Sequence, residues 1–179
     1  AKFLLDPKMG KKIYEELRKF KNDNIIKNIG VSIYSISDLK NIIKKFPIDV
    51  VLISLNIFDQ RILNEKIINI LKKKNIKIYT RSTFLQGLLL MPKHKIPKKF
   101  DRWKKKFDMW FAELKSKKVN AYDACLDFVL NNKNVDKTLI GIDDFKQFKE
   151  IFKDRSKFKI NYNKFNSNKI NKLINPAKW

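Results

Sequence analysis

Short runs of β-branched and aliphatic residues alternate with amphipathic segments through the first half of the chain, and this alternation most constrains the fold. The three runs are centred on Val31, Val51 and Ile78, and each is long enough for one buried strand. Apolar residues at the three- and four-residue spacing of a helix follow each of the first two runs. Strict alternation of this kind is typical of parallel βαβ units, so the sequence predicts an α/β fold with a parallel sheet.

The same patterns set the expected boundaries of the elements. Strands are expected over residues 2–5, 29–33, 49–54, 76–80 and 137–141. Helices are expected over residues 7–20, 39–46 after a cap at Ser37-Asp38, 64–73, 100–115, 121–130 and 143–152. Residues 92–118 interrupt the rhythm as an insertion, in which aromatic residues at helical spacing predict a packing face. We therefore expect one domain over residues 1–152 and a polar C-terminal tail over 153–179, with a weak helix at 169–174.

The charge balance raises the question of an anionic partner. The chain has 41 Lys and Arg against 18 Asp and Glu, a formal net charge of +23, and lysines interleave with aromatics over residues 93–118. Such an excess is typical of proteins that bind nucleic acid or anionic surfaces. However, the basic residues are mostly Lys and are spread over every segment among abundant Asn and Ile, as a drift toward A/T-rich codons would produce. We prefer a solvated lysine surface with nonspecific polyanion binding, and specific nucleic-acid binding is the alternative.

The sequence lacks the residues that several common classes of site require. The four glycines stand alone, so neither a G-x-G-x-x-G nor a Walker loop is present. The single histidine, His94, has no second His or Cys near it, which argues against a metal site. The single cysteine, Cys125, lies on an apolar helix face as an inert core thiol, and the lack of a disulfide framework fits a reducing, cytoplasmic compartment. No apolar run approaches the roughly 20 residues that span a bilayer, so no membrane partner is expected.

The segment after the third run is the strongest candidate for a ligand site. Arg81, Ser82 and Thr83 directly follow the strand expected at 76–80, and Gly87 lies in the same loop. In α/β proteins, ligands bind at the carboxyl ends of the strands, where such polar, glycine-containing loops begin. The alternative interpretation is an ordinary junction between a strand and a loop.

Four segments resemble the aldo/keto reductases, most closely a bacterial branch of that family. They read Gly-Val-Ser at 30–32, Asn-Ile-Phe-Asp-Gln-Arg at 56–61, Arg-Ser-Thr-Phe-Leu-Gln-Gly at 81–87, and Gly141 followed by Gln147 and Glu150. The resemblance covers about residues 3–152. It implies part of a (β/α)8 TIM barrel, about strands four to eight with their helices. It also implies NADP or NAD as cofactor and hydride transfer to a carbonyl substrate, with a sugar-related carbonyl as one candidate.

The resemblance assigns cofactor-binding roles to eight residues and a catalytic role to none. The family's catalytic histidine would fall on Leu5, and its Tyr, Lys and Asp lie on strands that this chain does not contain, so the chain alone is predicted to be inactive. Arg81 takes the place of the ring that stacks on the nicotinamide. Asp143 replaces an Arg and would repel a 2′-phosphate, which puts the family's preference for NADP in doubt. The expected cofactor-binding residues are Ser32, Arg81, Ser82, Phe84, Gln86, Gly87, Gly141 and Gln147.

Three of these residues have a simpler alternative role. Ser32 could bond only within its own loop, Arg81 could pair with Asp59, and Gly141 could serve only the backbone geometry. For the whole chain, the alternatives are a non-catalytic remnant or half-barrel, whose unpaired strand edges favour self-association, and a basic nucleic-acid-binding protein. If the cofactor interpretation holds, the loop at 81–87 should line one concavity, bordered by Ser32, Asn56 and the turn at 141–144, because all of them follow parallel strands.

Overall fold

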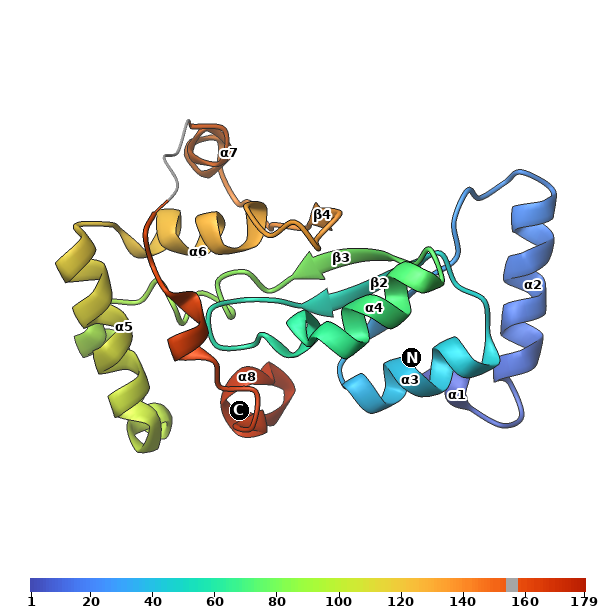
Figure 1. Ribbon diagram of the computed structural model, residues 1–179, viewed down its shortest axis with the longest axis horizontal. Coiled ribbons are helices and arrows are strands. Elements are labelled where there is room, and N and C mark those ends of the chain that lie inside the picture. Colours follow the sequence, from blue (N-terminus) through green and yellow to red (C-terminus); the bar gives the residue numbers. More distant parts are fainter. Residues whose placement is uncertain (154–157) are drawn as a thin grey trace.

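A parallel four-stranded sheet forms the centre of the computed structural model, which describes residues 1–153 and 158–179 (Figure 1). The strands are β1 (Gly30–Ile33), β2 (Val50–Ser54), β3 (Lys77–Arg81) and β4 (Lys137–Thr138), and they lie in this order across the sheet. The register places Val31 beside Val51 and Val51 beside Ile78, so the three predicted strand centres are direct neighbours. The predicted α/β fold with a parallel sheet is confirmed.

Helices connect and cover the strands. They are α1 (Lys2–Leu5), α2 (Gly10–Asn22), α3 (Ile36–Lys45), α4 (Glu65–Lys73), α5 (Lys104–Lys117), α6 (Ala121–Leu130), α7 (Phe145–Ile151) and α8 (Asn171–Ile174). Side chains of Asn64, Asn120 and Asp144 accept a backbone N–H at the start of α4, α6 and α7. Ser35, rather than the predicted Ser37-Asp38 pair, caps α3, because its hydroxyl accepts the N–H of Asp38.

The first residues form a helical turn instead of the predicted strand over residues 2–5. The N–H of Leu5 donates to the carbonyl of Ala1 at 3.0 Å, and the Ala1 ammonium donates to the Ser32 carbonyl at 3.2 Å. Leu4 is buried against the neighbouring helices, which places the one-turn helix α1 on α2 and α3 rather than beside β1. β1 is therefore the first strand of the sheet, and Leu5 lies on no strand.

The last strand is shorter than predicted. β4 pairs with β3 only over Lys137 and Thr138, although the expected strand ran to residue 141. The N–H of Leu139 still donates to the Thr80 carbonyl at 2.7 Å, but the chain then leaves the sheet. Side chains beyond this point have no core to enter, since Leu139 is 47% and Ile142 is 42% exposed.

The insertion at residues 92–118 packs into the core through its aromatic side chains. A 3-10 helix at Lys98–Trp103 precedes α5, so the α-helix begins later than predicted. Phe100, Phe107 and Trp110 are buried, and the Trp110 indole N–H donates to the Leu89 carbonyl at 3.2 Å. Because these rings are inside the protein, they cannot stack on nucleic-acid bases.

The predicted polar tail also contributes to the core. Phe165, Leu173 and Ile174 are buried, and α8 lies within the segment 169–174 where a weak helix was predicted. The Tyr162 hydroxyl donates to the carboxylate of Asp127 on α6 at 2.6 Å, and burial followed by this bond raises the pKa of Tyr162. The tail prediction missed this packing because the buried residues are isolated in a polar sequence. Residues 154–157 of the tail lie outside the described part of the chain.

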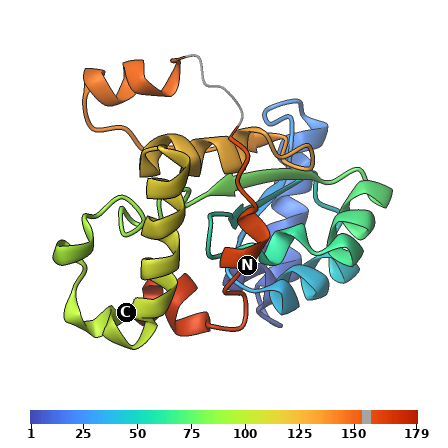
Figure 2. The same ribbon diagram turned by 60° about the vertical axis from the view of Figure 1, so that its left-hand side comes forward.

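Figure 2 shows α7 at the upper edge of the molecule, clear of the helices that cover the sheet. In the described part of the chain, no helix has both the length and the apolar content that a membrane span requires.

Gly10 allows α1 to dock on α2. A Cβ atom built on Gly10 would lie 2.1 Å from the carbonyl oxygen of Leu4. We expect Gly10→Ala to lower the free energy of unfolding by about 1–3 kcal/mol, the usual cost of overpacking, despite the better helix propensity of alanine. Urea denaturation measures this change. Gly141→Ala is the matched control because nothing lies within 4 Å of its Cβ position. Equal stability of both variants would show that α1 does not dock as described.

Candidate functional site

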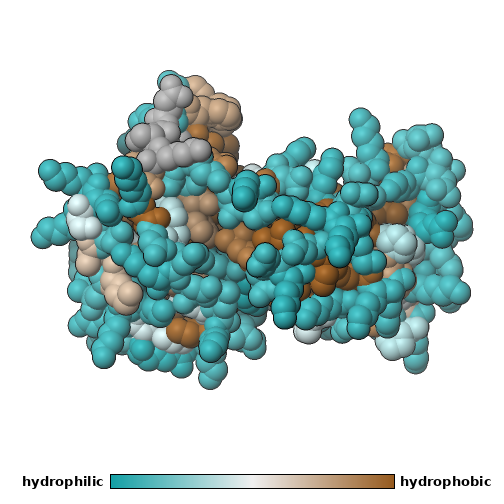
Figure 3. Space-filling model, viewed as in Figure 1, coloured by the Kyte–Doolittle hydropathy of each residue, from teal (hydrophilic) through white to brown (hydrophobic). Residues whose placement is uncertain are grey.

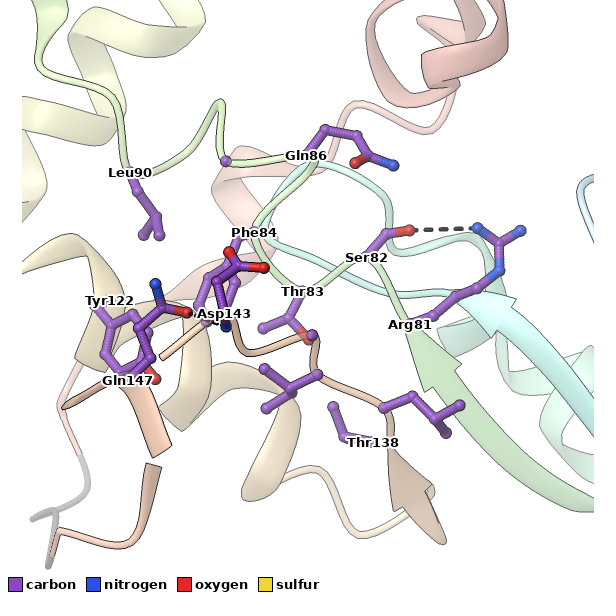
Figure 4. Close-up of a pocket in the computed structure, with 14 residues that line it drawn as sticks. Arg81, Ser82, Thr83, Phe84, Gln86, Leu90, Tyr122, Thr138, Asp143 and Gln147 are labelled. Atoms are coloured by element: carbon purple, nitrogen blue, oxygen red, sulfur yellow. Dashed lines mark hydrogen bonds between the residues drawn. The ribbon is translucent and has the colours of Figure 1, made fainter. Parts of the chain in front are cut away.

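A cavity of about 1120 Å³ lies where β3 and β4 end, between the loop after β3 and the turn after β4 (Figure 4). The side of the loop after β3 is formed by Arg81, Ser82, Thr83, Phe84, Gln86 and Gly87. The opposite side is formed by Thr138, Leu139, Gly141, Asp143 and Gln147. All of the predicted cofactor-binding residues except Ser32 therefore line one concavity.

Two residues that were expected at its border do not line it. Ser32 is half-buried on β1, two strands away from β3, and its carbonyl accepts the Ala1 ammonium. Asn56 follows β2, but its side chain is completely buried behind the loop. Both predictions assumed that the concavity extends across all the strand ends, whereas it opens only over β3 and β4.

The backbone of the loop after β3 has an unusual concentration of left-handed residues. Ser82, Leu85 and Gln86 have φ angles of 63°, 48° and 55°, and Gly87 has a φ of 79°. Only the glycine adopts this region without a steric penalty. Conformations of this kind cluster at functional sites, and successive left-handed and right-handed residues direct backbone N–H groups into a concavity that suits anions.

This loop also carries polar groups without partners. The Thr83 hydroxyl is buried and, within residues 1–153 and 158–179, has no hydrogen-bond partner. In the same part of the chain, no oxygen accepts a hydrogen bond from the backbone N–H of Thr83, Phe84, Gln86 or Gly87. Burying a hydroxyl without a partner costs about 1–3 kcal/mol. The loop is therefore held in a conformation whose donors an external acceptor can satisfy.

Asn56 fixes the start of the loop. Its amide nitrogen donates to the Ser82 carbonyl at 3.1 Å, and its amide oxygen accepts the N–H groups of Phe58 and Asp59 at 3.0 and 2.9 Å. Three hydrogen bonds from one buried side chain thus join the loops that follow β2 and β3. A buried amide whose oxygen and nitrogen both have partners favours a single arrangement of its neighbours.

Arg81 points away from the centre of the cavity. Figure 4 shows its guanidinium beside Ser82, on the side opposite Asp143 and Gln147, and it donates to the Ser82 hydroxyl at 3.3 Å. The guanidinium lies over the Tyr34 ring, 4.4 Å from the ring centroid, so it already stacks on an aromatic side chain of the protein.

The alternative pairing of Arg81 with Asp59 is wrong. Asp59 is fully buried and forms a two-pronged ion pair with Arg61, with N–O distances of 2.8 and 2.7 Å. Arg61 also donates to the Tyr34 carbonyl at 3.1 Å. The Asp59–Arg61 pair therefore fixes the loops after β1 and β2 and leaves Arg81 free of an acidic partner among the described residues.

An aromatic pair forms one wall of the cavity. The ring of Phe84 stacks on that of Tyr122 in α6, with centroids 5.0 Å apart and planes 18° apart. Sequence reasoning assigned no site role to Tyr122 or to the Thr83 hydroxyl. The only available signal for Tyr122 was its position in the first turn of a helix, two residues after the Asn120 cap.

Gln147 has a structural role in the turn after β4. Its side-chain oxygen accepts the N–H of Asp143 at 3.0 Å, and its own N–H donates to the Asp144 carboxylate at 2.8 Å. This reciprocal arrangement resembles a capping box and orders the start of α7. The φ of Gly141 lies outside the left-handed region and nothing lies within 4 Å of its Cβ position, so the backbone here does not require a glycine.

The cavity is electrically balanced although the protein is strongly basic. Arg81 and Asp143 are the charged residues among those that line it in the described structure. The described residues contain no group of three or more His, Cys, Asp and Glu that could hold a metal ion. Cys125 is fully buried, and burial raises the pKa of its thiol, which agrees with an inert core position.

Comparisons with solved structures support the same fold. The chain is similar to an aldo-keto reductase from Bacillus halodurans in its apo form, with a TM-score of 0.66, 18% identity, and coverage of 82% of this chain and 50% of that chain. The holo form of the same protein gives a TM-score of 0.61 and 18% identity, with coverage of 82% of this chain and 49% of that chain. A thermostable aldo-keto reductase in complex with the inhibitor epalrestat gives a TM-score of 0.53 and 18% identity, with coverage of 77% of this chain and 46% of that chain.

At this identity the likeness shows the fold, which is part of a TIM barrel, and the chain spans about half the length of these structures. No curated protein matches the sequence. The model of the aldo/keto reductase family, however, matches residues 6–174, which is most of the chain. The expected resemblance is thereby confirmed: the chain belongs to the aldo/keto reductase family.

Proposed function

We propose that this chain supplies the dinucleotide-binding loops of an NAD(P)-dependent oxidoreductase that acts on a small carbonyl substrate. One observation carries the proposal: the loop at 81–87 and the turn at 141–147 both contribute residues to one cavity, and donors of the first loop have no acceptor within the described structure. When bound, the nicotinamide would supply or accept the hydride. The chain's own part is to bind and orient the dinucleotide.

The residues of the cavity fit a phosphate-bearing ligand in three ways. The Thr83 hydroxyl and the unpaired backbone N–H groups of the loop at 81–87 are uncharged donors that can bind phosphate oxygens. The Phe84–Tyr122 wall offers an apolar surface for a planar ring. Arg81 keeps Ser82 in place through its hydroxyl, and we propose this positioning role in place of direct stacking on the nicotinamide.

Asp143 would determine the choice between the two cofactors. Its exposed carboxylate lines the cavity, and the turn that carries it is ordered by the bond from its N–H to Gln147. A carboxylate repels the additional 2′-phosphate of NADP. We therefore propose NAD as the preferred cofactor of this chain, although the sequence resemblance favoured NADP.

Replacing the Thr83 hydroxyl should weaken NADH binding without lowering the stability of the fold. In Thr83→Val, the free energy of unfolding should stay the same or rise by up to about 1 kcal/mol, because a buried unsatisfied group is removed. The dissociation constant for NADH should rise about fivefold, which corresponds to about 1 kcal/mol for one lost hydrogen bond. Urea denaturation and fluorescence titration of the chain measure the two quantities.

Thr80→Val is the matched control for that experiment. Thr80 is also buried, but its hydroxyl bonds to that of Thr138 at 3.0 Å on the neighbouring strand. This variant should lose about 1 kcal/mol of stability through the broken bond. If Thr83→Val loses as much stability as the control and binds NADH as tightly as the parent, Thr83 does not contact a ligand.

Removing the charge of Asp143 should favour NADPH. Two like charges 4 Å apart in water repel by about 1 kcal/mol, so Asp143→Asn should raise the affinity for NADPH relative to NADH about fivefold. Parallel titrations with both nucleotides measure the ratio. Asp101→Asn serves as the control, because Asp101 is exposed and lies outside this cavity. An equal change of the ratio in both variants would show that only the overall charge matters.

A further inference from the structure

A second cavity, of about 720 Å³, lies on the insertion, between α5 and the two short 3-10 helices that precede it (Lys93–Lys95 and Lys98–Trp103). We call it the insertion cavity. Its volume is within the range of small-molecule sites, about 300–1,000 Å³. Every residue that lines it belongs to the continuous segment 93–108, so it shares no residue with the sheet or with the candidate cofactor cavity.

Two phenyl rings form the bottom of the insertion cavity. Phe100 and Phe107 are each 2% exposed, and their rings meet at a steep angle with centroids 6.3 Å apart. The ring of Phe107 also contacts that of Phe58, and the ring of Phe100 contacts that of Trp179, at centroid distances of 5.4 and 5.0 Å. Because these rings are held on several sides, the bottom of the cavity needs no rearrangement before a ligand enters.

The two sides of the cavity are joined to each other. The Lys93 ammonium lies 2.5 Å from the Asp108 carboxylate, which ties the first 3-10 helix to α5. Both 3-10 helices contact α5, and Figure 2 shows this part of the chain beside that helix. The half-buried side chain of Ile96 lines the cavity between the two 3-10 helices and adds an aliphatic surface. A compact apolar group therefore fits between these sides.

The surroundings of the cavity are strongly basic. The segment 93–106 contains eight Lys and Arg against one Asp. Of these eight cations, only Lys93 forms an ion pair within residues 1–153 and 158–179. Hydrophilic side chains cover most of the face seen in Figure 3, including the end of the molecule where α5 lies. Cations gathered without acidic partners create a positive potential that attracts anions.

We propose that the insertion cavity binds a small anion that is attached to a compact apolar group. The apolar part would rest against Ile96 and the two phenyl rings, and the anionic part would reach the Lys104 ammonium. Lys93 is already paired with Asp108, so Lys104 is the lysine of the cavity whose charge is available to a ligand. Since this site shares no residue with the cofactor cavity, it does not rest on the proposed function.

Two charged residues of the cavity should have opposite effects on such a ligand. Lys104 and Asp101 both line the cavity and are exposed, so the first attracts an anion and the second repels it. Lys104→Gln should weaken binding about fivefold and Asp101→Asn should strengthen it about fivefold, the effect of one unit charge a few Å away in water.

A ¹⁵N NMR titration of the 179-residue chain tests the proposal with three probes. The probe 2-naphthoate combines an anion with an apolar ring system, 2-naphthalenemethanol keeps the rings without the charge, and inorganic phosphate keeps a charge without the rings. We expect 2-naphthoate to shift the amides of segment 93–108 and to bind at least about fivefold more tightly than either of the others. Added salt should weaken its binding, because salt screens exposed charges.

Two further variants separate the charge from the apolar contact. Lys105→Gln is the matched control for Lys104→Gln, because Lys105 is the next residue of α5, is also exposed and does not line the cavity. It should leave the affinity for 2-naphthoate unchanged. Ile96→Ser should weaken 2-naphthoate and 2-naphthalenemethanol alike, by about threefold, because it removes an aliphatic surface. Circular dichroism confirms that each variant retains its fold.

Three results would overturn the proposal. Equal weakening by Lys104→Gln and Lys105→Gln would show that 2-naphthoate responds only to the overall charge. Equal affinities for 2-naphthoate and 2-naphthalenemethanol would show that the cavity does not recognise an anion. Shifts confined to the loop at 81–87 and the turn at 141–147 would place the ligand in the other cavity.

Discussion

The buried amide of Asn56 is the contact on which the candidate site depends. It holds the Ser82 carbonyl at the start of the loop after β3, while its oxygen orders the loop after β2. The bidentate pair of Asp59 and Arg61 extends this linkage to the loop after β1 through the Tyr34 carbonyl. Three adjacent strand ends are thereby tied together by side chains that make no contact with the cavity. These buried hydrogen bonds allow a loop with left-handed residues to keep a single conformation.

The sheet gives this site a rigid base on one side and an open edge on the other. β2 is hydrogen-bonded to strands on both sides and is almost completely buried, so the ends of β2 and β3 are firmly placed. β4 is two residues long and adjoins exposed apolar side chains. The cavity spans this transition, because one wall rests on β3 and the other on the turn after β4. Its second wall thus rests on a shorter strand with fewer backbone hydrogen bonds than its first.

Much of the fold was predictable because the signals were local. The apolar runs around Val31, Val51 and Ile78 became adjacent strands, and the predicted helix over residues 121–130 agrees with the structure at both ends. The prediction for residues 2–5 was wrong because a run of only three apolar residues, at 3–5, fits a strand and a helical turn equally well. The packing of Leu4, which the local pattern does not contain, decides between them.

The candidate site was predictable in position more than in detail. Parallel strand ends and the resemblance both indicated the loop at 81–87 and the turn at 141–147, and these do line one cavity. The role of Asn56 could not be predicted, because its bond to Ser82 joins residues 26 positions apart in the sequence. Tyr122 was missed for the same reason, since its contact with Phe84 joins residues 38 positions apart in the sequence.

Chemical-shift mapping with NADH tests the central claim most directly. In ¹⁵N spectra of the 179-residue chain, we predict the largest shifts at the backbone amides of Thr83, Phe84, Gln86 and Gly87, whose N–H groups lack an acceptor in the described structure. Smaller shifts should occur in the turn at 141–147, which faces the same cavity. Shifts confined to the lysine-rich segment at 93–118, or the absence of any shift at millimolar NADH, would contradict the assignment of this loop to the cofactor.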